Sequence, residues 1–257
     1  MALLADLHNH SCLSPCGSLD LSPRVLAEAA AARGVQVLAL TDHNTSRNCP
    51  AFAFHCRRLG IIPLYGLEVT TQEEIHMVTL FASLKAALEF GDYIYSIITP
   101  FPNDPEKTGD QVYVDADDNI EGELEYFLPS AADIGVDALG ARAAGYAGFV
   151  IPAHVDRPAF SMSSQLGVVV PGPWAAVECV RIPPLSEMGN PASPPLDTLG
   201  FPLVTASDAH YPEHVGRRPF KLDSTPEELL PGGPGGDVDQ EAFIRALSRR
   251  RGLADDL

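Results

Sequence analysis

The sequence predicts an α/β fold, in which a mostly parallel sheet closes into a single barrel. Seven short apolar runs alternate with segments of helical character, and parallel strands need crossover helices of this kind. The chain has 257 residues, a usual length for one α/β barrel. We therefore expect one barrel rather than an open sheet divided between two domains.

The expected strands are short and rich in Val, Ile and Leu. They comprise residues 3–7, 35–41, 61–69, 75–82, 148–153, 175–180 and 202–206. The expected helices cover residues 23–33, 50–59, 84–98 and 130–147, and a last helix covers residues 239–251. Ser22 is expected to cap the first helix, and Gly34 to end it.

Two segments fall outside this alternation. Residues 103–125 are acidic and polar around the sequence QVYVD, and we expect an inserted excursion there, such as a hairpin. Residues 231–237 (PGGPGGD) are expected to form a flexible Gly/Pro linker before the last helix. The chain is therefore expected to form one barrel domain over residues 1–230. A Gly/Pro linker and a C-terminal helix that packs on or caps the barrel would follow over residues 231–257.

Charge and hydropathy exclude several classes of function. The chain has 17 basic and 34 acidic residues, a net charge of −17, which disfavours non-specific binding of long nucleic acid. No apolar run approaches the roughly 18 residues that span a bilayer, and the N-terminus lacks the features of a signal peptide. The five cysteines form no CxxC pair, which favours a reducing compartment. We expect a cytoplasmic protein without membrane contacts; nothing in the sequence indicates an oligomeric state.

Histidines and carboxylates recur at or near the ends of the expected strands. In an α/β barrel the carboxyl ends of the strands converge on one mouth, where catalytic groups gather. A single histidine at such a position is more often structural, but the whole set needs one explanation. Imidazole and carboxylate clusters suit Zn, Fe or Mn, and more than four ligands imply more than one ion. The candidate metal ligands are His8, His10, His43, Glu68, His76, His154, Asp208 and His210.

These residues stand in motifs that resemble those of the PHP (polymerase and histidinol phosphatase) superfamily. DLHNH, TDHN, the strand-end Glu, IHMV, PAH and SDAH occur in the order typical of that superfamily, from about Asp6 to Tyr211. The resemblance implies a distorted (β/α)7 TIM-like barrel and a trinuclear metal centre with phosphoesterase activity. It also implies that Glu68 bridges two of the two to three divalent ions. The SPCG and PAHVDRP segments look most like those of small stand-alone PHP proteins.

One segment departs from the PHP pattern. PHP proteins commonly carry an Asp shortly after the HxH motif, where this chain has Ser14-Pro15-Cys16-Gly17. Cys16 is expected to replace that carboxylate as a thiolate on the ion shared with His43 and His210, which would favour Zn or Fe. The alternatives are a weak or empty third site, a sulfur ligand from Cys12 or a carboxylate ligand from Asp20.

Other side chains are candidates for binding substrate or for orienting the ligands. Arg157 follows His154 by three residues and is the preferred phosphate clamp, because a guanidinium can hold two phosphate oxygens. Arg181 and Arg217 are weaker candidates for the same role. Asp6 and Asp42 are expected to orient ligand imidazoles by hydrogen bonds, or else to cap turns. His55 and His214 have no motif context, although His214 is a minor candidate proton donor.

The sequence thus predicts an enzyme, a metal-dependent phosphoesterase. Attack by a metal-bridging hydroxide would require no protein nucleophile. The expected partner is a small phosphorylated substrate or a short oligonucleotide. One alternative is an exonuclease or nucleoside-bisphosphate phosphatase that acts on short nucleic-acid ends. The other is a catalytically weak metal-binding accessory module.

Overall fold

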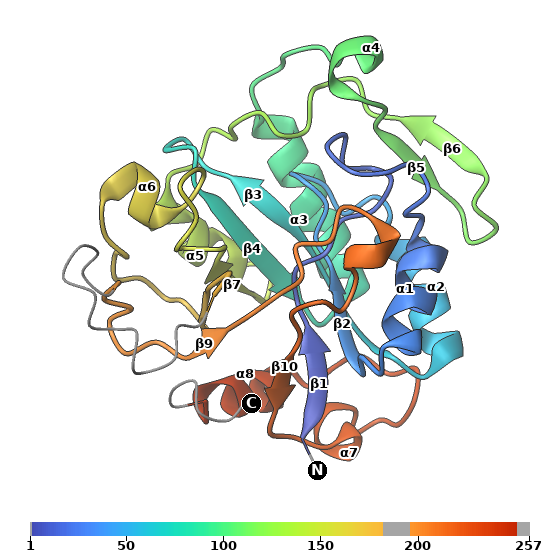
Figure 1. Ribbon diagram of the computed structural model, residues 1–257, viewed down its shortest axis with the longest axis vertical. Helices are drawn as coiled ribbons and strands as arrows, with labels where there is room; N and C mark the ends of the chain where they lie inside the picture. Colours follow the sequence, from blue (N-terminus) through green and yellow to red (C-terminus); the bar gives the residue numbers. More distant parts are fainter. Residues whose placement is uncertain (1, 182–195, 251–257) are drawn as a thin grey trace.

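The strands follow one another around a ring. The computed structural model describes residues 2–181 and 196–250 and has a mixed α/β architecture (Figure 1). The main sheet has the strand order β10-β1-β2-β3-β4-β7, and β8 pairs with β9 separately. The strands of the barrel are β1 (Leu3–Asp6), β2 (Val37–Leu40), β3 (Ile62–Thr70), β4 (His76–Phe81), β7 (Gly148–Pro152), β8 (Val177–Glu178), β9 (Leu203–Val204) and β10 (Phe220–Leu222).

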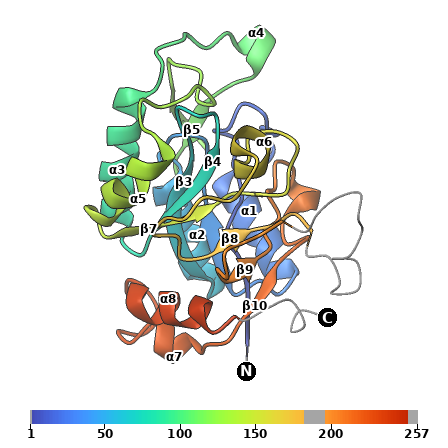
Figure 2. The same cartoon turned by 90° about the vertical axis from the view of Figure 1, so that its left-hand side faces the viewer.

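Single bridges complete the ring. Val150 of β7 pairs with Trp174, just before β8, and Asn9, just after β1, pairs with Ala209, beyond β9. Figure 2 shows β7, β8 and β9 on the same side of the molecule. The seven strands expected from the apolar runs are all present. They form a distorted (β/α)7 TIM-like barrel, in which short bridges rather than long ladders join β8 and β9 to their neighbours.

The expectation of a mostly parallel sheet is wrong at two strands, because β10 is antiparallel to β1 and β4 is antiparallel to both of its neighbours. Strands β1, β2 and β3 are parallel, but β4 is antiparallel to both β3 and β7. The five residues between β3 and β4 are too few for the crossover that a parallel connection needs. The start of β4 therefore lies beside the end of β3, where His76 pairs with Thr70.

The helices lie around the barrel, in the excursion and at the end of the barrel that contains the N-terminus (Figure 1). They are α1 (Pro23–Ala32), α2 (Cys49–Leu59), α3 (Leu84–Ile97), α4 (Pro105–Thr108), α5 (Val136–Ala144), α6 (Met162–Leu166), α7 (Pro226–Leu229), α8 (Gln240–Ser248) and the 3-10 turn Pro212–His214. The Ser22 hydroxyl caps α1 by accepting from the backbone N–H of Val25, as expected. No helix among the described residues is long and apolar enough to cross a membrane.

One expected helix is too long. Residues 130–135 were expected to begin the helix that the structure starts only at Val136. The backbone N–H of Thr99 donates to the carbonyl of Ala131, and that of Asp133 donates to the carbonyl of Ile97. This segment therefore forms extended pairings with the residues after α3 instead of a helical turn. The last expected helix is α8; its final expected residue, Arg251, lies outside the described residues.

An apolar cluster fills the interior of the barrel below its mouth. Inward-facing strand residues such as Ala5, Val37 and Leu64 fill the interior, as in other barrels of this type. Phe243 of α8 belongs to this cluster, and its ring lies 5.7 Å from that of Phe149. Helices α7 and α8 lie at the end of the barrel that contains the N-terminus (Figure 1), so the opposite end carries the candidate site.

The expected excursion contains α4 and an antiparallel hairpin, β5 (Val112–Val114) and β6 (Ile120–Glu123). The hairpin packs beside α2: the Val114 N–H donates to the Asn48 side chain, and the His55 ring donates to the Ala116 carbonyl at 2.8 Å. His55 is thereby occupied with a structural contact.

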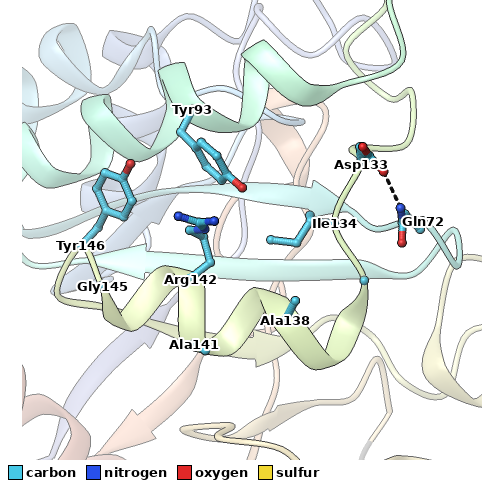
Figure 3. Close-up of a pocket in the computed structure, with 10 residues that line it drawn as sticks. Gln72, Tyr93, Asp133, Ile134, Ala138, Ala141, Arg142, Gly145 and Tyr146 are labelled. Atoms are coloured by element: carbon cyan, nitrogen blue, oxygen red, sulfur yellow. Dashed lines mark hydrogen bonds between the residues drawn. The ribbon is translucent and has the colours of Figure 1, made fainter.

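A wide groove lies between α3 and α5, with a cavity volume of about 770 Å³. Tyr93 and Tyr146 line it, and the Arg142 guanidinium lies 4.8 Å from the centre of the Tyr93 ring (Figure 3). None of the eight candidate metal ligands lines this groove.

Candidate metal centre

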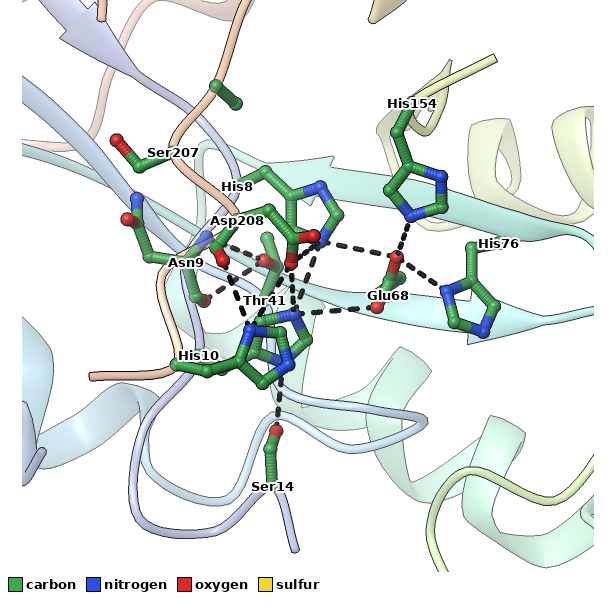
Figure 4. A network of polar contacts seen from close by, with 12 residues as sticks. His8, Asn9, His10, Ser14, Thr41, Glu68, His76, His154, Ser207 and Asp208 are labelled. Carbon is green, nitrogen blue, oxygen red and sulfur yellow. Dashed lines mark hydrogen bonds and ion pairs between the residues drawn. The ribbon is translucent and has the colours of Figure 1, made fainter. Parts of the chain in front are cut away.

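Glu68 lies at the centre of the candidate site. It is 1% exposed and belongs to β3, in which every residue is buried. Histidine nitrogens from four other segments lie between 2.9 and 3.4 Å from its carboxylate oxygens (Figure 4). These histidines are His8, His10, His43, His76 and His154.

Asp208 provides a second carboxylate. Its Oδ1 lies 3.6 Å from His8 Nε2 and 3.3 Å from His10 Nε2, and 3.5 Å from His210 Nδ1. His8 and His10 therefore face both carboxylates. The structure brings together all eight residues that the motifs single out.

Hydrogen bonds fix how His8 and His10 present their rings. His8 Nδ1 lies 2.8 Å from Glu178 Oε2, and a carboxylate can only accept, so His8 donates from Nδ1. His10 Nδ1 lies 2.9 Å from Ser14 Oγ, whose own proton goes to Asp42 Oδ1 at 2.7 Å. The Ser14 oxygen therefore accepts from His10 Nδ1. Both rings turn Nε2 toward Glu68 and Asp208.

The spacing of these nitrogens fits metal coordination. His8 Nε2 and His10 Nε2 are 3.2 Å apart: the contact is a hydrogen bond while His8 is protonated on both nitrogens, and a repulsion between two lone pairs once both rings are neutral. Two nitrogen ligands of a tetrahedral zinc ion, each 2.0–2.1 Å from it, are about 3.3 Å apart. A shared cation would turn this repulsion into two bonds. Four groups of three donors could each hold an ion: His10, His43 and His210; His8, Glu68 and His154; His8, His10 and Asp208; and His43, Glu68 and His76.

The protonation states also suit cation binding. Burial, together with the neighbouring His210, lowers the pKa of His10 to about 4, and burial lowers the pKa of His43 well below its usual range. Burial alone would raise the pKa of Glu68, but the surrounding histidines, His76 first, lower it well below its usual range. His10 and His43 therefore offer lone pairs beside an ionised carboxylate, the donor set that Zn, Fe and Mn accept. His8 differs: burial alone would lower its pKa, but the carboxylates of Glu178, Glu68 and Asp208 raise it well above its usual range, so a cation must displace a proton to bind this ring.

Residues 6–126 match the family model of the PHP domain. The chain contains a PHP domain. This finding confirms the family that the ordered motifs indicate.

Other known proteins resemble the chain more distantly. A 78-residue segment is 40% identical to a 5'-3' exoribonuclease of Haemophilus influenzae and covers 29% of this chain and 27% of that protein. Endonuclease Q, solved with a 27-mer duplex that contains an abasic lesion, superposes with a TM-score of 0.61 at 17% identity. The superposition covers 96% of this chain but 56% of Endonuclease Q. The chain thus spans about a quarter of the exoribonuclease and little more than half of Endonuclease Q.

A proposed metal-dependent phosphoesterase from Bifidobacterium adolescentis superposes over 97% of this chain and 96% of its own, with a TM-score of 0.52 at 18% identity. At these identities the structural likenesses establish the fold.

Cys16 lies where this PHP domain departs from the usual pattern. Its Sγ is 3.3 Å from His43 Nε2, and its loop is tied to His210 by a hydrogen bond from the Ser18 N–H to the His210 carbonyl. Cys16 is exposed as a residue, but desolvation of its thiol by the surrounding protein and the charges of Glu68 and Asp208 raise the pKa of that thiol to about 12, so a cation must displace its proton to bind it.

The two alternatives to Cys16 lie elsewhere. The Cys12 thiol contacts the Val112 carbonyl of the hairpin and the Asn48 side chain, so the structure does not bring it to the donors. Asp20 is exposed and belongs to none of the four donor groups found among the described residues.

Of the three candidate arginines, the structure brings Arg157 to the site. Its Nη1 lies 2.8 Å from Asp208 Oδ2, and it lines the cavity above the donors. Arg217 instead donates from Nε to the Ser207 carbonyl, and Arg181 is exposed and does not line that cavity. His214 packs edge-on against Tyr211 and also lies outside the lining.

Asp6 and Asp42 support the ligands less directly than expected. Asp6 accepts hydrogen bonds from the backbone N–H groups of Ser207 and Gly216, and so holds the segment that carries Asp208. Asp42 acts on His10 only through Ser14. The carboxylate that orients a candidate ligand directly, by accepting from His8 Nδ1, is Glu178, which the motif analysis missed. A charged residue inside the apolar run AAVECV is the signal that could have found it, because a buried charge needs a partner.

The backbone around the site is strained. Four non-glycine residues here have positive φ: His154 (31°), Asp208 (47°), Asn44 (51°) and Phe160 (54°). Such conformations cost roughly 1–3 kcal/mol each and cluster at functional sites, because surrounding contacts must hold them. Two of these residues are candidate metal ligands and one follows His43, so the fold holds the donor positions at a cost in stability.

Proposed function

We propose that the chain is a metal-dependent phosphoesterase with a centre of two or three divalent transition-metal ions, Zn, Fe or Mn. The convergence of five histidines on Glu68, with Asp208 facing His8 and His10, carries this proposal. A PHP domain over residues 6–126 supports the same reaction class.

The ligands would be the eight motif residues and Cys16. Glu68 would bridge two ions, because it belongs to two of the donor groups, one with His8 and His154 and the other with His43 and His76. The group formed by His10, His43 and His210 would hold a further ion, completed by the Cys16 thiolate.

When bound, the cations supply Lewis acidity, which lowers the pKa of coordinated water and offsets charge on phosphoryl oxygens. The chain's own residues position the reactants. Arg157 would hold the phosphoryl group by hydrogen bonds to its oxygens, turning from Asp208 toward the substrate. Glu178 and Ser14 keep the Nδ1 atoms of His8 and His10 occupied, so that Nε2 stays available for metal.

A second candidate function is hydrolysis at short nucleic-acid ends, as an exonuclease or nucleoside-bisphosphate phosphatase. The 40% identity to an exoribonuclease over 78 residues favours it. The net charge of −17 disfavours long nucleic acid but leaves a short end free to reach the donors. A catalytically weak metal-binding module is less consistent with the structure, because all eight motif donors are in place.

The test is hydrolysis of three substrates: an aryl phosphate, an aryl phosphodiester and a short 5'-phosphorylated RNA. Each is assayed with the protein reconstituted with Zn, Fe or Mn. We expect turnover of at least one, lost in His8→Ala and retained in His55→Ala, which alters a structural histidine that belongs to none of the four donor groups. Turnover of RNA alone would select the nucleic-acid alternative. No turnover with any metal, in protein that binds metal, would leave only the accessory module.

A further inference from the structure

The cavity above the donors has two chemically different sides. Its volume is about 380 Å³, within the usual range for a small-molecule site. One side consists of the donors and Arg157. The other side, here called the aromatic wall, consists of Phe127, Pro129 and Phe160.

Phe160 is held in place to present its ring. Its φ of 54° is unusual for a bulky residue, and its carbonyl accepts a hydrogen bond from the His76 N–H at 3.0 Å. The ring stacks on the His76 imidazole with centroids 4.8 Å apart and planes 18° apart. Phe160 nevertheless remains 42% exposed, so part of this aromatic surface is available at the cavity.

The turn with Phe127 and Pro129 is tied to the donors as well. The Asn44 side chain donates to the carbonyls of Leu128 and Ser130, at 2.7 and 2.8 Å. Asn44 directly follows His43 and is buried, and its own φ is positive. The same residue therefore fixes a candidate ligand on one side and the aromatic wall on the other.

These features limit which alcohol portion, the part esterified to phosphate, a substrate can carry. A phosphate ester with its phosphorus at the donors must place the rest of the molecule in the same cavity. A polyol or peptide group that packed on the aromatic wall would give up hydrogen bonds to water. The wall side chains have no polar atoms to replace them, so binding would cost free energy. A planar ring would instead stack on aromatic carbon without that loss.

We propose that Phe127, Pro129 and Phe160 form a subsite for a planar aromatic ring in the alcohol portion of the substrate, the part that is esterified to phosphate. This inference rests on the proposed phosphoesterase function and narrows its substrates to phosphate esters that carry such a ring.

The experiment compares benzyl phosphate with cyclohexylmethyl phosphate in the metal-loaded enzyme. Both are esters of primary alcohols of similar size and acidity, so they differ mainly in the planarity of the ring. We expect kcat/KM to favour the benzyl ester by roughly 2- to 12-fold, the range of aromatic pair interactions. Phe160→Leu keeps an apolar side chain but removes the aromatic face, and should bring the ratio of the two kcat/KM values close to one.

One control variant and one further wall variant separate an effect at the subsite from an effect on the rest of the protein. Phe101→Leu alters another exposed phenylalanine, 59% exposed and outside the cavity lining, and should keep the wild-type ratio. Phe127→Leu repeats the test from the other part of the wall, in case Phe160→Leu lowers the melting temperature.

The possible outcomes distinguish a failure of the subsite proposal from a failure of the proposed phosphoesterase function. Hydrolysis of both esters with the same ratio in the wild type, Phe160→Leu and Phe127→Leu would overturn the subsite and leave the phosphoesterase intact. If no ester is hydrolysed, the proposed function fails, and calorimetric titration of the metal-loaded protein with benzylphosphonate and cyclohexylmethylphosphonate tests the wall. Equal affinity for these two ligands would overturn the subsite as well.

Discussion

The inner and outer parts of the donor cluster are built differently. His8 and His10 are fully buried, and each has a fixed partner on Nδ1, Glu178 for one and Ser14 for the other. Cys16 and His210 lie toward the solvent, where the His210 side chain is 21% exposed. The ring of His210 has its Nδ1 beside the carbonyl of Asp208, two residues earlier, rather than beside a buried carboxylate of another element.

This contrast indicates how the ions would differ. Donors that are oriented before binding lose little conformational freedom when they coordinate a cation. Ions held by the inner histidines and Glu68 should therefore bind more tightly than the ion beside Cys16 and His210, and exchange more slowly. The following predictions test that difference, from the largest expected effect to the smallest.

Removing the central carboxylate should have the largest effect. Glu68→Gln keeps the size of the side chain but removes the charge that faces five histidines. The loss of kcat/KM should exceed the roughly 10- to 100-fold that removal of an outer partner of a metal ligand costs. Glu121→Gln, which changes an exposed carboxylate of the hairpin, is the matched control and should leave kinetics unchanged. Residual activity of Glu68→Gln above a tenth of the wild type would contradict a central role for Glu68.

Arg157→Ala should impair substrate binding while the metal content stays unchanged. Loss of a charge-assisted hydrogen bond costs about 1.5–3 kcal/mol, roughly 10- to 150-fold in kcat/KM. Arg181→Ala, an exposed arginine that does not line the cavity, serves as the control. Unchanged steady-state kinetics in Arg157→Ala would transfer the phosphate-binding role to another residue.

Glu178→Gln should weaken metal binding at the inner donors. The amide oxygen can still accept a hydrogen bond from His8 Nδ1. The negative charge that makes the imidazole a stronger metal ligand is lost. We expect the dissociation constant of the most tightly bound ion to rise by about 10- to 100-fold, measured by competition with a chromophoric chelator. The exposed Glu123→Gln is the control. Equal dissociation constants in Glu178→Gln and wild type would show that Glu178 serves only the packing of β8.

Cys16→Ala should affect only the outer ion. The protein should lose one ion per chain and keep the others, because the group of His8, Glu68 and His154 contains neither Cys16 nor the histidine that Cys16 contacts, His43. X-ray absorption of the zinc-loaded wild type should show a sulfur ligand at about 2.3 Å. Cys16→Asp should restore the missing ion and favour Mn, a harder cation. A zinc spectrum that lacks any sulfur neighbour would remove Cys16 from the ligand set.

Local sequence patterns predicted much of the barrel and the motif residues of its mouth. Seven apolar runs gave the seven strands, since a buried strand is recognisable from its own residues. The direction of β4 and the shortened start of α5 depended on contacts with other segments. Residues 131–133 adopt an extended conformation because they pair with the chain at the end of α3 and just after it. A helical pattern in the local sequence cannot show such a pairing.

The site shows the same division. The donors stand in motifs and were predicted individually, and the structure brings all eight together. Glu178 is 170 residues from His8 along the chain and meets it only because β8 joins the ring. Ser14 belongs to the SPCG segment, but its action between Asp42 and His10 depends on where its hydroxyl proton points, which the sequence does not show. Phe127 and Phe160 carry no motif, and only the folded chain places them above the donors.

The most direct test of the account is elemental analysis of the protein purified without chelators, by inductively coupled plasma mass spectrometry, with His8→Ala analysed in parallel. We predict at least two transition-metal ions per wild-type chain and a clear loss in His8→Ala. Fewer than one ion per wild-type chain, with none taken up on reconstitution with Zn, Fe or Mn, would contradict the metal centre and with it the proposed function.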